Sequence, residues 1–119
     1  MKYDERQKIS YTFVEGPAVF DPADLVYVES SLHRCLFHYR NDSVLSTYRK
    51  LDDIEAMLSD DRMIRIHQSY LINMDYCVKV SNYTLWIRGG QRFSVPRARY
   101  RFVKERFVEH RLQKERTDK

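Results

Sequence analysis

The sequence predicts a mostly β domain in which about seven or eight short strands accompany two helices. Two observations carry this prediction. Short runs rich in β-branched and aromatic side chains recur along the chain, and turn residues such as Gly, Pro, Asn and Asp separate them. Only residues 50–58 and 97–113 show the apolar period of a helix. A length of 119 residues suits one domain with a single modest core.

The first half of the chain is expected to supply strands. Residues 9–15 predict a strand that ends at Gly16 and Pro17, and a short extended piece follows at residues 18–20. Residues 25–29 are apolar on both faces, with Leu25 and Tyr27 expected on the same face, which predicts a central strand. Two further strands, at 33–40 and 44–48, are expected to form a hairpin at the edge of the sheet.

Residues 50–58 predict a short central helix. Leu51, Ile54 and Leu58 fall on one stripe, which is the pattern of a helix with one buried face. The carboxylates of Asp52 and Asp53 lie in its first turn, where they suit the positive end of the helix dipole.

A strand at residues 62–66 then leads into a polar corner. Ile64 and Ile66 alternate with Arg65 and His67, as expected for a strand with one buried face. Residues 67–73 lose the alternation, which predicts a compact turn that directs polar groups outward. Such groups can reach the phosphates and base edges of nucleic acid, or they can form one well-hydrogen-bonded structural corner.

The last third predicts a hairpin, a final strand and the second helix. Residues 75–80 and 84–87 are expected to pair, and residues 91–95 follow as the last strand. Pro96 ends this strand and suits the start of a helix, because the first-turn N–H groups have no partner there. In the helix at 97–113, the first half is strongly basic. Its buried stripe is predicted to be Tyr100, Val103 and Phe107.

The composition is compatible with a polyanion partner but does not require one. Lys and Arg outnumber Asp and Glu by 21 to 17, and the pI is about 9.1. No metal-site spacing of His or Cys and no glycine-rich phosphate loop is present, so neither an enzyme nor a cofactor is expected. Cys35 and Cys77 are expected to be buried or free thiols. Without a long apolar run or an apolar leader, the chain is expected to be cytoplasmic and away from membranes.

The run R-I-H-Q-S-Y-L-I-N at residues 65–73 resembles the signature of LytTR DNA-binding domains. The likeness continues through D-L-V-Y-V-E-S-S-L-H-R upstream and R-F-S-V-P-R-A-R-Y downstream, and it covers about residues 9–108. Pro96 departs from the family pattern, which usually has Ser before the last Arg; here Ser94 lies two positions earlier. The resemblance implies layered antiparallel β-sheets with two short helices, one central and one C-terminal. It also implies binding to duplex DNA through loops that enter successive major grooves.

The resemblance assigns candidate DNA contacts by position. The candidates for reading bases are His33, Gln68 and Arg97. The candidates for phosphate contacts are Arg34, Arg65, His67, Ser69, Asn73 and Arg99. A corner hydrogen bond is the alternative for Asn73, and structural anchoring is the alternative for His67. The amide of Gln68 suits adenine, and the fork of Arg97 suits guanine N7 and O6.

The expected organisation is a frayed segment or cut linker at residues 1–8, a DNA-binding domain at 9–113 and a polar tail at 114–119. The resemblance implies a bacterial transcription regulator of a two-component system, with two copies on a direct-repeat site. A receiver domain or a regulatory partner protein would supply its input. Two other functions stay open: a protein-interaction module with exposed strand edges, and a single-strand binder that stacks bases on its aromatics. The aromatics considered for such stacking are Tyr39, Tyr48, Tyr83 and Trp86.

Overall fold

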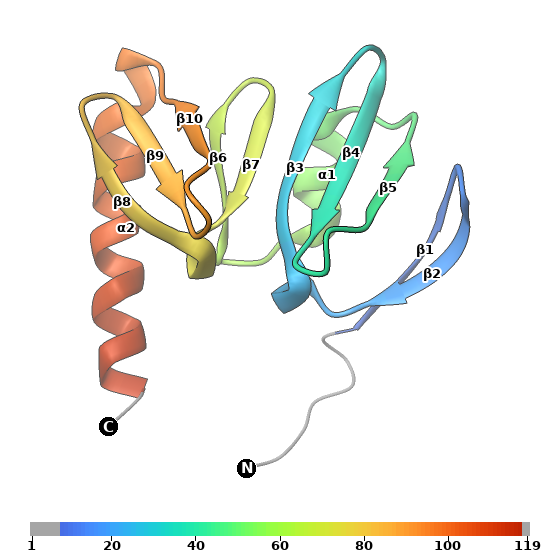
Figure 1. The fold of residues 1–119 in the computed structure, drawn as a ribbon, viewed down its shortest axis with the longest axis horizontal. Helices are drawn as coiled ribbons and strands as arrows, with labels where there is room; N and C mark the ends of the chain where they lie inside the picture. The colour runs from blue at the N-terminus through green and yellow to red at the C-terminus, as the bar shows by residue number, and fades with distance from the viewer. Residues whose placement is uncertain (1–7, 118–119) are drawn as a thin grey trace.

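A computed structural model describes residues 8–117, and their strands and helices form three layers (Figure 1). The strands are β1 (Ile9–Phe13), β2 (Gly16–Phe20), β3 (Leu25–Ser31), β4 (Arg34–Tyr39), β5 (Val44–Thr47), β6 (Met63–His67), β7 (Tyr70–Asn73), β8 (Cys77–Ser81), β9 (Thr84–Ile87) and β10 (Arg92–Ser94). The helices are α1 (Leu51–Leu58) and α2 (Arg97–Thr117), with short 3-10 turns at η2 (Pro22–Asp24) and η3 (Met74–Tyr76). The mostly β, antiparallel architecture predicted from the sequence is confirmed. The predicted N-terminal segment lies outside the described residues except for Lys8, as do the last two residues of the predicted tail.

The middle layer is a five-stranded antiparallel sheet in the order β5-β4-β3-β7-β6. Helix α1 and the β1–β2 hairpin cover one face, and the three-stranded sheet β10-β9-β8 and α2 cover the other. Neighbouring residues in β7 show the two-sided burial, because Leu71 packs into the core beside α1 and Ile72 packs into the core beside α2. Both side chains are fully buried, and burying a side chain of this size contributes roughly 1.5–3 kcal/mol to the free energy of folding.

The described residues form ten strands, and two of these were not predicted as complete strands. The dipeptide Gly16–Pro17 was predicted to end a strand, but it begins β2, which pairs back onto β1. Pro17 is tolerated there because the two-stranded sheet has only edge strands. Residues 67–73 were predicted to form a turn throughout. Only Gln68 and Ser69 turn, and β7 follows between β3 and β6. A strand buried on both faces lacks polar alternation, which explains the wrong prediction.

The predicted central position of strand β3 is confirmed, but its predicted facing is wrong. Leu25 lies in the core beside α1 and Tyr27 in the opposite core, because the register of β3 against β4 shifts between these two residues. A bulge of this kind places an extra residue in one strand and reverses the alternation beyond it.

Both helices lie where the apolar periods placed them. In α2 the side chain of Val103 is fully buried, and Tyr100 and Phe107 pack beside it as predicted. The helix continues to Thr117, past the predicted end at residue 113. Its last turns are rich in Lys, Arg, Glu and Gln, which are good helix formers even where no apolar face requires burial.

The tip of the β1–β2 hairpin covers the free edge of β5. The Val14 N–H donates to the Ser46 carbonyl at 2.8 Å. The Glu15 carboxylate accepts the Ser46 hydroxyl at 2.6 Å and the Ser46 N–H at 2.8 Å. These hydrogen bonds, with the hydroxyl contributing most, hold the pKa of Glu15 below its ordinary value.

The substitution Glu15→Gln is expected to destabilise the fold in a pH-dependent way. A carboxyl whose pKa is lowered in the folded state stabilises that state above its unfolded pKa, and this contribution disappears as the pH falls through the folded pKa. Urea unfolding at pH 7 and at about pH 3 should therefore show a difference between wild type and Glu15→Gln that shrinks in acid. An equal difference at both pH values would show that the charge of Glu15 is not involved.

Candidate nucleic-acid interface

Three hairpin turns and the start of α2 lie at one edge of the molecule (Figure 1). The turns join β3 to β4, β6 to β7 and β8 to β9. We call this surface the turn edge; it comprises residues 32–33, 68–69 and 82–83 and the first turn of α2. His33 lies in the β3–β4 turn, Gln68 lies in the β6–β7 turn and Arg97 begins α2, and the side chain of each is exposed.

Two of the turns hold non-glycine residues in the left-handed backbone region. Leu32 and His33 have φ of 47° and 70°, and Asn82 and Tyr83 have φ of 52° and 58°. Two consecutive positive φ values define the tight hairpin turn whose twist matches that of the strands. A bulky residue in this conformation costs energy that the surrounding hairpin must offset. Leu32 is nevertheless 91% exposed, so no apolar burial explains its place in the turn.

One end of the turn edge surrounds a basic hollow of about 380 Å³ between the β3–β4 turn, the β5–α1 junction and the β6–β7 turn. Arg34 lies on its wall, donates to the Tyr48 hydroxyl at 3.0 Å and places its guanidinium over the Tyr48 ring, 5.0 Å from the ring centre. The lining includes Ser30, His33, Arg34, Tyr48, Arg49, Lys50, Leu51, Asp52, Arg65 and Gln68.

The other end of the turn edge holds Arg97, the first residue of α2. Its guanidinium lies over the Tyr83 ring, 5.0 Å from the ring centre, and donates to the Tyr83 hydroxyl at 3.3 Å. Tyr83 in turn packs against Tyr100, with 4.5 Å between ring centres. An arginine therefore rests on a tyrosine at each end of the turn edge. Such cation–π contacts limit the freedom of the side chain before any ligand arrives.

Arg65 lies beneath the β6–β7 turn and is only 17% exposed. Its Nε donates to the His67 carbonyl at 2.8 Å, and its Nη2 donates to the Gln68 carbonyl at 2.7 Å. Nη1 donates to Asp52 at 2.8 Å and to Glu55 at 2.9 Å. These four bonds use four of the five N–H groups of a guanidinium. The geometry therefore favours a structural role for Arg65 over a phosphate contact.

Arg99 is half-buried and also contacts the neighbouring strand. It donates to the Arg65 carbonyl and lies over the Phe102 ring, 4.5 Å from the ring centre. Arg99 thus joins the first turn of α2 to strand β6. This arrangement ties the turn that carries Gln68 to the helix start that carries Arg97.

His67 and Asn73 have different surroundings although both belong to the signature motif. His67 accepts the Ser69 N–H at Nδ1, at 2.9 Å, so the neutral ring carries its proton on Nε2. Asn73 is fully buried, donates to the Leu25 carbonyl at 2.8 Å and accepts the Asp75 N–H at 2.8 Å. Asn73 therefore leaves the set of candidate phosphate contacts, and its corner hydrogen bonds are the observed alternative.

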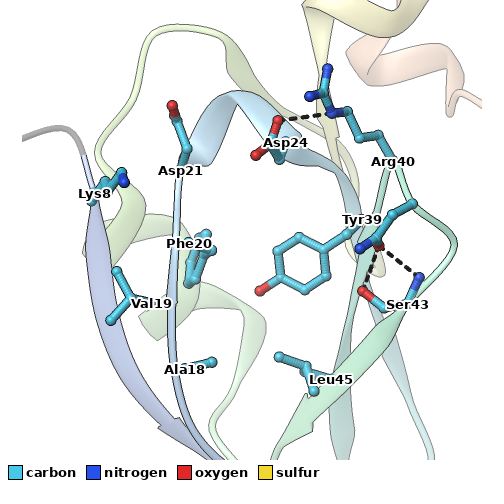
Figure 2. A pocket seen from close by; sticks show the side chains of 11 residues that line it. Lys8, Ala18, Val19, Phe20, Asp21, Asp24, Tyr39, Arg40, Ser43 and Leu45 are labelled. Atoms are coloured by element: carbon cyan, nitrogen blue, oxygen red, sulfur yellow. Dashed lines mark hydrogen bonds and ion pairs between the residues drawn. The ribbon is translucent and has the colours of Figure 1, made fainter. Parts of the chain in front are cut away.

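A larger hollow of about 460 Å³ lies between β2 and the β4–β5 hairpin, toward the far end of β4 from the turn edge (Figure 2). On its rim, Arg40 pairs with Asp24 at 3.0 Å. Tyr39 lines this hollow but is only 8% exposed, and its hydroxyl is buried without a hydrogen-bond partner among the described residues. Tyr39 is therefore not placed to stack a base.

The structure gives four residues roles at the candidate interface that the sequence analysis did not predict. Arg49 and Lys50 line the basic hollow, and Tyr48 and Tyr83 support the two exposed arginines. The signal available for Arg49 and Lys50 was their place at a predicted strand-to-helix junction. Which edge of the molecule that junction would reach depends on the sheet order, which the sequence alone did not supply.

Neither cysteine is placed for chemistry. Cys35 and Cys77 are free and buried, in agreement with the sequence, and burial raises the pKa of both thiols, that of Cys77 to about 11. Within residues 8–117, no cluster of three or more His, Cys, Asp or Glu side chains is arranged to hold a metal ion. Neither described helix is long and apolar enough to cross a membrane.

Comparison with known proteins identifies the class of domain. The sequence profile of the LytTr DNA-binding domain matches residues 17–108. The chain belongs to the LytTR family of DNA-binding domains, which serve transcription regulators.

Individual relatives agree with this assignment. The sensory transduction protein LytT of Oceanobacillus iheyensis is 30% identical over 83 residues, which make up 70% of this chain and 32% of that protein. The chain thus spans about a third of the length of this curated relative. A solved LytTr DNA-binding domain from Bacillus cereus has a TM-score of 0.68 at 17% identity, covering 86% of this chain and 96% of that chain. This structural match shows a shared fold.

Proposed function

We propose that this domain binds specific sequences in duplex DNA by placing the turn edge against successive major grooves at short direct repeats. The observation that carries the proposal is that the two turns holding His33 and Gln68 and the start of α2, which holds Arg97, meet at one edge (Figure 1). The longest dimension of the domain is 40 Å, compared with about 34 Å for one turn of B-DNA. The domain as a whole is therefore slightly longer than one turn of the duplex that it would follow.

The proposed roles follow from exposure and donor geometry. Arg97 offers a two-pronged donor to guanine, Gln68 offers an amide to adenine, and His33 offers an imidazole from an exposed turn. The proposed phosphate contacts are Arg34, Arg49, Lys50, His67 and Ser69. Arg65 and Arg99 are proposed to support the turn edge from beneath. Four of the five N–H groups of Arg65 are already hydrogen-bonded, and Arg99 donates to the Arg65 carbonyl.

We further propose that the domain serves a bacterial two-component system and receives its signal from a receiver domain or a regulatory partner protein. The similarity to a sensory transduction protein supports this proposal. The match covers only the part of that protein that corresponds to the present domain. The input is tested by asking whether a phosphorylated receiver domain, joined to this domain or added to it, tightens its binding to DNA.

The DNA proposal is tested by fluorescence anisotropy of the purified chain against random duplexes and single strands over a salt series. Duplex binding should weaken steeply with salt, because each neutralised phosphate contributes about 0.9 to the slope of log K against log salt. Selection from random duplexes should then return a common sequence. Tighter binding to single strands than to duplexes would favour the single-strand alternative instead.

The substitution Lys50→Ala is expected to weaken binding to selected and random duplexes by the same factor. Lys50 lines the basic hollow and precedes α1, so its ammonium is placed for a phosphate and carries no base information. The salt slope should fall by about one. Lys114→Ala, with the same charge change near the far end of α2, should leave both quantities unchanged. A loss confined to the selected duplex would contradict the phosphate role.

A further inference from the structure

We infer that two carboxylates of α1, those of Asp52 and Glu55, position the β6–β7 turn for base reading and so determine sequence specificity. Neither residue is placed to touch a base; both act through Arg65. The inference rests on the proposed function, because it concerns how Gln68 is presented to DNA.

The guanidinium of Arg65 is held between α1 and the turn. On one side, Nη1 donates to Asp52 at 2.8 Å and to Glu55 at 2.9 Å. On the other side, Nε and Nη2 donate to the carbonyls of His67 and Gln68. A guanidinium is a rigid plane, so its orientation toward α1 also fixes its orientation toward the turn. The carboxylates therefore determine where the Gln68 carbonyl is held.

The turn is attached on its other flank by the sheet. The Ser30 N–H of β3 donates to the Ser69 carbonyl at 2.9 Å. The Gln68 side chain projects from the turn and is exposed. Loss of the two carboxylates would detach the Arg65 guanidinium from α1 and leave the turn held by the sheet and by the bond from Arg99 to the Arg65 carbonyl. A bidentate contact to a base edge depends on placement, so this loosening should affect base reading first.

The charges of Asp52 and Glu55 oppose any simple electrostatic explanation. A carboxylate near an anionic duplex repels it, and Asp52 lines the basic hollow beside Lys50. If these groups acted only through charge, their removal would strengthen binding to every duplex equally. A positioning role predicts a different pattern. Binding to random duplexes should be unchanged or tighter, while the preference for the selected duplex over a random one should fall.

Each ion pair alone is expected to matter little. The side chains of Asp52 and Glu55 are 83% and 45% exposed, and exposed ion pairs are weak because water screens them. The two carboxylates share one nitrogen of Arg65, so either can hold it when the other is lost. The informative variant is therefore the double substitution Asp52→Asn/Glu55→Gln.

The test compares wild type, Asp52→Asn/Glu55→Gln and the control Asp53→Asn on a selected duplex and a scrambled duplex. Asp53 is an exposed carboxylate in the same first turn of α1, without a hydrogen bond to Arg65. The ratio of the two Kd values should fall by roughly five- to tenfold in the double variant, within the approximately 5- to 150-fold that one bidentate base contact supplies. Binding to the scrambled duplex should be unchanged or tighter, and Asp53→Asn should keep the wild-type ratio.

Amide hydrogen exchange of the free proteins supplies a readout that does not need DNA. The Gln68 and Ser69 amides should exchange faster in the double variant, while the central strand β3 keeps its protection. Unchanged exchange in the turn, or an unchanged Kd ratio, would overturn the inference and leave the proposed function intact. Equal weakening on both duplexes with a lower Tm would also overturn it, in favour of a general structural role. If the wild-type protein bound the selected and scrambled duplexes equally well, the proposed function would be wrong, and this inference with it.

Discussion

Replacing Asn73 with alanine is expected to lower the free energy of unfolding by about 2–4 kcal/mol. The side chain is fully buried and serves the Leu25 carbonyl and the Asp75 N–H, each at 2.8 Å. A buried polar group left without a partner costs roughly 1–3 kcal/mol, and alanine would leave two. The bonds join the end of β7 to the start of β3 and to η3, the 3-10 turn that leads into β8.

Urea denaturation followed by circular dichroism measures the effect of Asn73→Ala, and Asn41→Ala is its matched control. Asn41 also accepts a backbone N–H two residues ahead, that of Ser43 at 3.0 Å, but it is exposed and water can replace the bond. The control should cost about 1 kcal/mol or less. Equal losses in the two variants would show that burial does not decide the role of Asn73.

The substitution Arg97→Ala is expected to remove roughly 1–3 kcal/mol of discrimination between a selected duplex and a random one. Arg97 begins α2 at the turn edge, where Tyr83 supports its guanidinium from below. Loss of a two-pronged contact to one base pair should relax the preference at that position and leave other positions unchanged. Competition binding against single-base variants of the selected duplex measures this change.

Two matched variants separate base reading from charge. Arg97→Lys keeps the charge but loses the planar fork, so it should retain affinity for random duplexes while losing most of the discrimination. Arg111→Ala removes the same charge from the same helix, 14 residues and about 21 Å further along its axis. It should preserve the preference. A lysine variant with wild-type discrimination would assign Arg97 to the phosphates.

Much of the fold was predictable because most strands have one buried face. The helix α1 and the buried stripe on α2 followed from their apolar periods, and the hairpin β4–β5 followed from two strand-like runs on either side of the Asn41-Asp42 turn. The strand β7 was missed because both of its faces are covered, so Leu71 and Ile72 give no alternation. The facing of Leu25 and Tyr27 was mistaken because a bulge changes the register between them. A bulge depends on the partner strand and leaves no local periodic signal.

The resemblance supplied the candidate residues, but their surroundings were not predictable from the sequence. His33, Gln68 and Arg97 lie exposed on one edge, as candidates for base contacts should. The engagement of Arg65 could not be foreseen, because Asp52 and Glu55 come from a different element. Such pairings depend on the packing of α1 against the sheet, which the alternation within β6 does not specify.

The hairpin that covers β5 also bears on how the domain behaves at high concentration. Free strand edges template pairing with other chains, and β5 would be such an edge if the groups of Ser46 were not already bonded to Val14 and Glu15. A chain whose hairpin has swung away would expose part of an unpaired strand beside the exposed side chain of Val44. By covering this strand edge, the tip of the hairpin should reduce aggregation as well as stabilise the folded domain.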